Sequence, residues 1–232
     1  MSLYDRLDLT KPNRQLKAPI WERIDLTRPP KLRCRGCRSR IQSSWRVCPQ
    51  CGWLIASKDS ETRHCVWVDV SGMSIDREDK VMLEILEDAL AKVFSAFRSV
   101  NVFLTSDPPE SREWGQNFTH VYAFIDEQPV DYLGIASFSH GKVTDRAAVR
   151  VDRIFNASYR ASLNLYQLSN LIANTIAHEI GHTLGLDHSQ LPTDVMHDGL
   201  DHRIHSLMPP SFHAEQIILM NNAIRKHKVL LA

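Results

Sequence analysis

The sequence has no long hydrophobic run, no apolar leader and almost no net charge, and each absence excludes a class of protein. No apolar segment approaches the roughly 20 residues that a membrane-spanning helix needs. Residues 1–30 scatter charges and prolines among isolated Leu and Ile, so they lack the apolar core of a secretory signal. We therefore expect a cytoplasmic protein that does not contact a membrane. The formal charge of +1 argues against binding to nucleic acid by bulk charge.

The near-neutral total is the sum of two segments with opposite charge. Residues 1–63 hold 14 Lys and Arg against 6 Asp and Glu, a net charge of +8, whereas residues 64–232 hold 14 against 21, a net charge of −7. At 232 residues, with 43% hydrophobic and 24% charged residues, the chain accommodates one ordinary globular domain and a small extra module. The basic segment can dock on the acidic one, or each can attract a different partner.

Residues 1–31 are rich in proline and charge and have little apolar periodicity, so we expect an extended tail. A short repeat lies within it, because residues 5–12 (DRLDLTKP) recur as residues 22–29 (ERIDLTRP) with conservative changes. The repeat is either a chance repetition in a segment of biased composition or a pair of linear docking motifs for a groove on this chain or on a partner.

Four cysteines follow the tail in a C-x2-C-x10-C-x2-C pattern: Cys34, Cys37, Cys48 and Cys51. Two residues between thiolates allow a tight turn to direct both sulfurs at one ion, and two such turns complete the tetrahedral four-sulfur site of structural zinc. Disulfides are disfavoured by the odd cysteine count and the missing signal. Iron is the other alternative, but the ten-residue spacer is short for a rubredoxin. Residues 32–55 therefore resemble a small zinc ribbon, followed by a polar linker over residues 56–63.

The ribbon alone does not identify a function, because many ribbons bind nucleic acid and many bind protein. Its basic residues fit either partner, and they fit a solvated surface equally well: Arg33, Arg35, Arg38, Arg40 and Arg46.

Residues 64–232 alternate strand and helix patterns, which predicts an α/β fold. We expect strands over residues 65–70, 100–105, 119–126, 133–139 and 147–155. We expect helices over residues 76–97, from 163 or 169 to 184, and over 212–226. The first of these helices would be capped by Ser74 or Asp76 with acidic residues in its first turn, and the last by Ser211. Cys65 lies outside the four-cysteine pattern and is expected to be a buried free thiol in a strand.

The chemistry of the chain is concentrated near the end of the middle helix. His178 and His182 are four residues apart, so their side chains differ by roughly 40° around the helix axis and can bind one metal ion. Glu179 adjoins the first ligand and can act on a metal-bound water. Gly185 allows the left-handed conformation that ends a helix, which lets the chain turn back and supply His188 as a third ligand. Three imidazoles leave one position open, as catalytic zinc requires.

These residues match the H-E-x-x-H-x-x-G-x-x-H signature, so residues 64–232 resemble the catalytic domain of metzincin metalloproteases. The resemblance implies a mixed twisted sheet, an active-site helix, a C-terminal helix and a methionine turn at Met196. Ser189 and the spacing to Met196 are most similar to the matrixin branch. Asp198 occupies the position of the tyrosine ligand of astacins and serralysins, so that ligand is not expected. The resemblance also implies that an edge strand binds an extended substrate: Leu133, Gly134, Ile135, Ala136 and Ser137.

The sequence thus predicts a zinc-dependent endopeptidase with two zinc ions, one catalytic and one structural. In this hypothesis the zinc-bound water attacks the peptide carbonyl after Glu179 takes its proton, and the N-terminal ribbon restrains or targets the enzyme. The alternative is a zinc-ribbon adaptor that binds nucleic acid or a protein partner and carries a latent or inactive metzincin domain.

Overall fold

The computed structural model describes residues 64–73, 75, 79–107, 118–126, 128, 130–199 and 202–231. The predicted tail, zinc ribbon and linker, residues 1–31, 32–55 and 56–63, lie outside this part of the chain. Within the described residues, no helix combines the length and the apolar character that crossing a bilayer requires.

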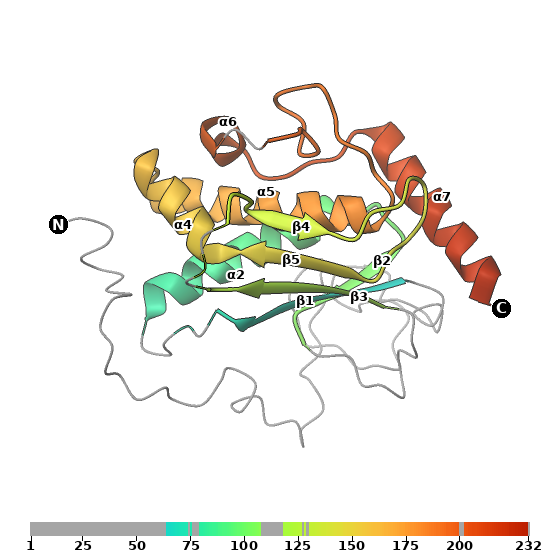
Figure 1. The fold of residues 1–232 in the computed structure, drawn as a ribbon, viewed down its shortest axis with the longest axis horizontal. Coiled ribbons are helices and arrows are strands. Elements are labelled where there is room, and N and C mark those ends of the chain that lie inside the picture. The colour runs from blue at the N-terminus through green and yellow to red at the C-terminus, as the bar shows by residue number, and fades with distance from the viewer. Residues whose placement is uncertain are drawn as a thin grey trace, which may run out of the picture.

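Five strands form one mixed sheet in the order β2-β1-β3-β5-β4 (Figure 1). Their bounds are β1 (His64–Gly72), β2 (Val102–Thr105), β3 (Phe118–Phe124), β4 (Gly134–Ala136) and β5 (Arg146–Arg150). β1, β2, β3 and β5 run parallel to one another, whereas β4 pairs antiparallel with β5. The short strand β4 therefore forms one edge of the sheet.

A buried central helix organises the rest of the domain. The helices are α2 (Lys80–Ala96), α4 (Val151–Arg160), α5 (Leu165–Thr183), α6 (His202–Leu207) and α7 (Ala214–Leu231). α5 packs against α2, α4 and α6 and against strands β3, β4 and β5. In Figure 1, α4 and α7 lie at opposite ends of the molecule and α5 runs between them. Every residue of α5 from Leu168 to Thr183 is buried, including polar side chains such as Asn174, His178 and Glu179.

The α/β prediction is confirmed, but two helix starts differ from the sequence prediction. The N-cap of α2 is Asp79, whose side chain accepts a hydrogen bond from the Met82 amide at 3.0 Å, and the first turn holds no acidic residue. The caps predicted at Ser74 and Asp76 are therefore wrong. α7 begins at Ala214, and the Gln216 side chain accepts from the His213 amide at 2.9 Å. The predicted start at Phe212 with Ser211 as its cap is therefore wrong as well.

The strand predicted over residues 147–155 is also wrong beyond Arg150, where α4 begins. Val151, Ile154 and Phe155 are buried in α4 at helical spacing, and Asp152 in the first turn favours the helix start. The short helix α6 was not predicted. Cys65 is a buried free thiol in β1, as predicted, and burial raises its pKa to about 12.

Candidate metal centre and active site

Three imidazole nitrogens converge at the end of α5. Nε2 of His182 lies 3.0 Å from Nε2 of His178 and 3.0 Å from Nε2 of His188. Ligand nitrogens on one tetrahedral zinc ion lie roughly 3.3 Å apart, so the observed spacing fits zinc. Among the described residues, these three histidines are the group of metal-ligating side chains close enough to share an ion.

The opposite ring nitrogens fix the tautomers that a metal ligand needs. Nδ1 of His178 donates to the Val195 carbonyl at 2.8 Å, and Nδ1 of His182 donates to the Leu186 carbonyl at 2.8 Å. The proton therefore resides on Nδ1 and the lone pair of Nε2 remains available. Burial lowers the pKa of His178 to about 4 and also lowers that of His182. Both rings are therefore neutral near pH 7, and the donor set fits a catalytic zinc ion.

The turn after α5 brings the third histidine back to the first two. Gly185 has a φ of +89°, the left-handed conformation that glycine adopts most readily. A Cβ at this position would also lie only 2.7 Å from the Lys142 amide nitrogen. The Leu186 amide donates to the Gly181 carbonyl at 3.0 Å, which closes the end of the helix. The predicted role of Gly185 in reversing the chain toward His188 is confirmed.

Glu179 lies beside the three histidines and against strand β4. Its side chain is buried, and desolvation raises its pKa to about 8. A Cβ added to Gly134 would lie 2.6 Å from Cδ of Glu179, so the carboxyl group occupies the space that the missing side chain leaves free. A carboxyl group with a pKa near neutrality can both accept and donate a proton.

The loop around Met196 lies directly under α5. Met196 is fully buried, and a Cβ added to Gly181 would overlap its sulfur atom. Asp194, only 4% exposed, accepts hydrogen bonds from the Met196 amide at 2.8 Å and from Nε2 of Gln216 at 3.0 Å. No role for Asp194 was predicted from the sequence, although an aspartate that accepts from the amide two residues later is a recurrent turn signal.

The predicted substrate strand lies at the sheet edge, next to the histidines. β4 comprises Gly134, Ile135 and Ala136, and Leu133 and Ser137 flank it. One side of β4 pairs with β5, and in the sheet formed by the described strands its other side has no neighbour. Ile135 is 54% exposed, and the exposed Phe138 ring lies 5.5 Å from the His182 ring. An extended chain added to β4 would therefore pass Glu179 and His182.

A family model of metallopeptidases matches the part of the chain that holds the proposed site. Residues 95–189 match the model of the reprolysin-like metallopeptidases of family M12B, and this segment includes Glu179 and all three histidines. No curated protein sequence matches the chain. The family match and the three-histidine site together support a catalytic zinc ion. The assignment to the matrixin branch stays a prediction.

The similar solved structures include two archaemetzincins. That from Methanopyrus kandleri is 15% identical over 71% of this chain and 97% of its own, with a TM-score of 0.41. That from Archaeoglobus fulgidus, complexed with malonate, is 20% identical over 67% and 99%, with a TM-score of 0.41. A zinc-dependent peptidase from Methanocorpusculum labreanum is 17% identical over 68% and 99%, with a TM-score of 0.40.

Proposed function

We propose that the chain is a zinc-dependent endopeptidase of the metzincin type. His178, His182 and His188 hold the ion, Glu179 moves the proton, and the free edge of β4 holds the substrate. The observation that carries this proposal is the convergence of three Nε2 atoms beside a buried carboxyl group that lies against an edge strand. The matrixin-like assignment is part of the proposal and rests on Ser189 and the spacing to Met196.

The side chains and backbone of the site have separate tasks in this reaction. When bound, the zinc ion supplies Lewis acidity, which lowers the pKa of water and polarises the scissile carbonyl group. The backbone of β4 pairs with the extended substrate and holds it near the histidines. A carboxyl oxygen of Glu179 accepts a proton from the attacking water and later gives it to the amine nitrogen of the leaving peptide. The products are a new carboxyl group and a new amine.

The variant Glu179→Ala tests the proton-transfer role. We expect kcat/KM on a fluorogenic peptide to fall by about 10²–10⁴-fold, while the zinc content measured by mass spectrometry stays at the wild-type value. His182→Ala should lose one zinc ion per chain together with activity. Glu87→Ala removes an exposed carboxylate on α2 and serves as the matched control. Undiminished cleavage by Glu179→Ala would contradict the assignment.

We also propose that Cys34, Cys37, Cys48 and Cys51 hold a second, structural zinc ion. The C-x2-C-x10-C-x2-C spacing supports this, since it provides the four thiolates of a closed site. In the full chain, the double variant Cys34→Ser/Cys37→Ser should reduce the zinc content from two ions to one. A zinc content unchanged by the double variant would reject the structural site.

The basic N-terminal segment is proposed to restrain or target the acidic peptidase domain. The charges of +8 and −7 on the two segments support mutual attraction. If the contact restrains the enzyme, raising the salt concentration from about 0.05 M to about 0.5 M should increase turnover of an uncharged peptide, because salt screens exposed charges. Constant turnover would exclude electrostatic restraint.

The adaptor alternative is supported by the five ribbon arginines. It predicts salt-dependent binding of the full chain to RNA, DNA or a protein partner. The affinity should fall in the Cys34→Ser/Cys37→Ser variant, and the Glu179→Ala chain should bind as the wild type does. Binding that is unaffected by the cysteine variant would argue against a ribbon adaptor.

A further inference from the structure

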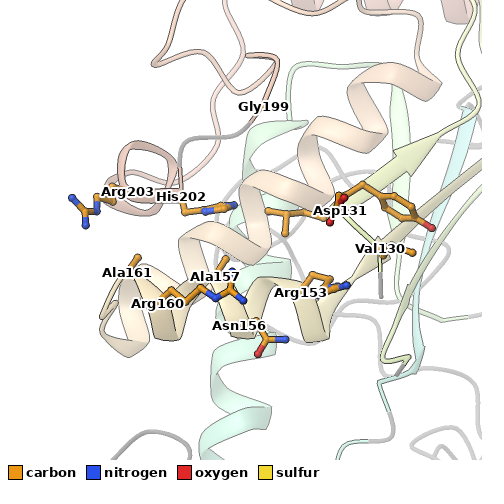
Figure 2. A pocket seen from close by; sticks show the side chains of 12 residues that line it. Val130, Asp131, Arg153, Asn156, Ala157, Arg160, Ala161, Gly199, His202 and Arg203 are labelled. Carbon is orange, nitrogen blue, oxygen red and sulfur yellow. The ribbon is translucent and has the colours of Figure 1, made fainter. Parts of the chain in front are cut away.

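A cavity of about 710 Å³ lies beside the proposed active site, between α4, residues 130–133, Gly199 and the start of α6 (Figure 2). It adjoins the site on two sides. Leu133 lines the cavity, and the next residue, Gly134, lies against the Glu179 carboxyl group. Gly199 also lines it and follows Asp198, whose Oδ1 lies 3.7 Å from Nδ1 of His188.

Positive charge dominates the wall of this cavity. α4 contributes Arg153 and Arg160 from one face, since residues seven apart complete two helical turns. Arg203 of α6 adds a third arginine, although its side chain extends away from the other two in Figure 2. Among the described residues of the lining, Asp131 is the single acidic one, and no ion pair between described residues joins it to Arg153 or Arg160. The described lining residues therefore carry three formal positive charges against one negative charge.

A carboxylate close to Arg153, that of Asp152, is already hydrogen-bonded to another arginine. Arg150, which is almost fully buried, donates from Nε to Oδ1 of Asp152 at 2.9 Å and from Nη2 to Oδ2 at 3.0 Å. Nε of Arg153 lies 3.9 Å from the same Asp152 carboxylate. This Nε is buried and has no hydrogen-bond partner, so the Asp152 carboxylate beside it does not satisfy the Arg153 guanidinium group.

Arg160, one turn beyond Ala157 on the same face, forms no ion pair with any described residue. Its guanidinium group is therefore available to an incoming anion, and two guanidinium groups on one helix face suit a carboxylate, which arginine binds through paired N–H donors. The cavity lining thus holds two guanidinium groups on one helix face, and that of Arg160 has no ion pair with a described residue.

The position of the cavity determines which part of a substrate reaches it. Antiparallel pairing is the more stable arrangement between strands, and β4 already pairs in this way with β5. A peptide that adds antiparallel to the free edge of β4 places its C-terminal half toward the start of that strand. Residues 130–133 precede Gly134 by one to four positions, which corresponds to about 3–13 Å along an extended chain.

We propose that this cavity binds a carboxylate of the substrate, held by Arg153 and Arg160, on the C-terminal side of the scissile bond. The carboxylate belongs either to an acidic side chain within four residues of the cleaved bond or to the C-terminus of the substrate itself. The inference rests on the proposed peptidase function, whose substrate class it narrows.

Matched peptides test the proposal in the full chain. One series places Glu or Gln at each of four positions on either side of the cleaved bond, and a second series compares a free C-terminus with an amidated one. We expect kcat/KM to be about tenfold higher for a carboxylate than for its amide at one C-terminal position or at the terminus, from charge-assisted hydrogen bonds. The series that shows the preference identifies the source of the carboxylate.

Variants of the cavity arginines test whether these residues cause the preference for a carboxylate. Arg160→Gln and Arg153→Gln should each reduce the carboxylate-to-amide ratio toward one and leave cleavage of the amide peptide within about twofold. Arg225→Gln, an exposed arginine on α7 at the other end of the molecule, should keep the wild-type ratio. Arg160 is exposed, so its variant carries the test even if Arg153→Gln does not fold.

The outcomes separate this inference from the proposed function. Binding of the same labelled peptides to the Glu179→Ala chain, measured by fluorescence anisotropy, reads out the cavity without turnover and should show the same preference of about tenfold. If the wild type cleaves no peptide, the peptidase proposal fails while the binding assay still tests the cavity. Equal affinity for acid and amide, a preference on the N-terminal side, or an unchanged ratio in Arg160→Gln would overturn the inference.

Discussion

Replacing Gly134 by alanine should disable the proposed catalytic base without touching a metal ligand. The new methyl group would lie 2.6 Å from Cδ and 2.7 Å from Cγ of Glu179, whereas ordinary van der Waals contact begins at 3.4 Å. It would lie closer still to Oε1, so the carboxyl group must withdraw by at least about 0.8 Å. A displacement close to 1 Å at a reacting group costs up to about 10²-fold in rate, so we expect kcat/KM to fall by about this factor.

The same clash should be visible in the stability of the protein. Forcing an extra methyl group into a packed site costs roughly 1–3 kcal/mol. For a domain of this size, about 2 kcal/mol lowers Tm by roughly 4–8 °C. Truncating Glu179 to alanine removes the atoms that collide with the methyl group. Adding Gly134→Ala to Glu179→Ala should therefore leave Tm almost unchanged. The two substitutions should therefore show a strong coupling energy.

Three measurements on four proteins complete this test: kcat/KM, zinc content and Tm for the wild type, each single variant and the double variant. Zinc content should be equal in all four, because Gly134 contacts the carboxyl group and none of the three ligands is changed. An equal loss of Tm in the presence and absence of the Glu179 side chain would refute the contact. Loss of zinc in parallel with activity would refute the claim that the effect is confined to the base.

Three further predictions concern residues around the site. Asp194→Ala leaves the buried Met196 amide and the Gln216 amide group without their acceptor. The free energy of unfolding measured in urea should fall by about 1–3 kcal/mol. A loss below about 0.5 kcal/mol would contradict the role of Asp194 in the turn. Gly181→Ala should press on the Met196 sulfur and weaken zinc binding by about tenfold in chelator competition. Affinity should recover when Met196 is also shortened to alanine. Burial raises the pKa of Cys65 to about 12, so its thiol should stay protonated at pH 8.5 in the folded protein. Its alkylation rate, measured by peptide mapping, should be about 10³-fold lower in the folded protein than in urea.

The sequence predicted the strands and long helices because their patterns are local, and it failed where tertiary contacts decide the structure. Residues 151–155 are apolar enough to extend a strand, but their buried face has helical spacing. The six residues of α6 have little periodicity of their own. Their last turn is held from outside, because Nδ2 of Asn174 donates to the carbonyl groups of His205 at 2.8 Å and Met208 at 2.9 Å.

The proposed active site also has a part that the local sequence predicts and a part that depends on tertiary contacts. The three histidines and Glu179 are recognisable in the sequence because metal-ligand spacing on one helix and the turn after it is a local property. The contact between Gly134 and Glu179 joins positions 45 residues apart in the chain. The sequence indicated that residues 133–137 form an edge strand, but only the fold shows that a missing side chain in this strand makes room for the carboxyl group.

Contacts beyond the ligands connect the geometry of the histidines to the C-terminal helix. Nε2 of Gln216 on α7 donates to Asp194, and Asp194 accepts from the Met196 amide and so fixes the turn. The same turn presents the Val195 carbonyl to Nδ1 of His178, which sets the tautomer of that ring. The orientation of His178 on α5 therefore depends on a side chain from α7, 38 residues further along the chain. The motif supplies the ligand atom of His178, whereas the turn, held by the last helix, selects the tautomer in which that atom can bind a metal ion.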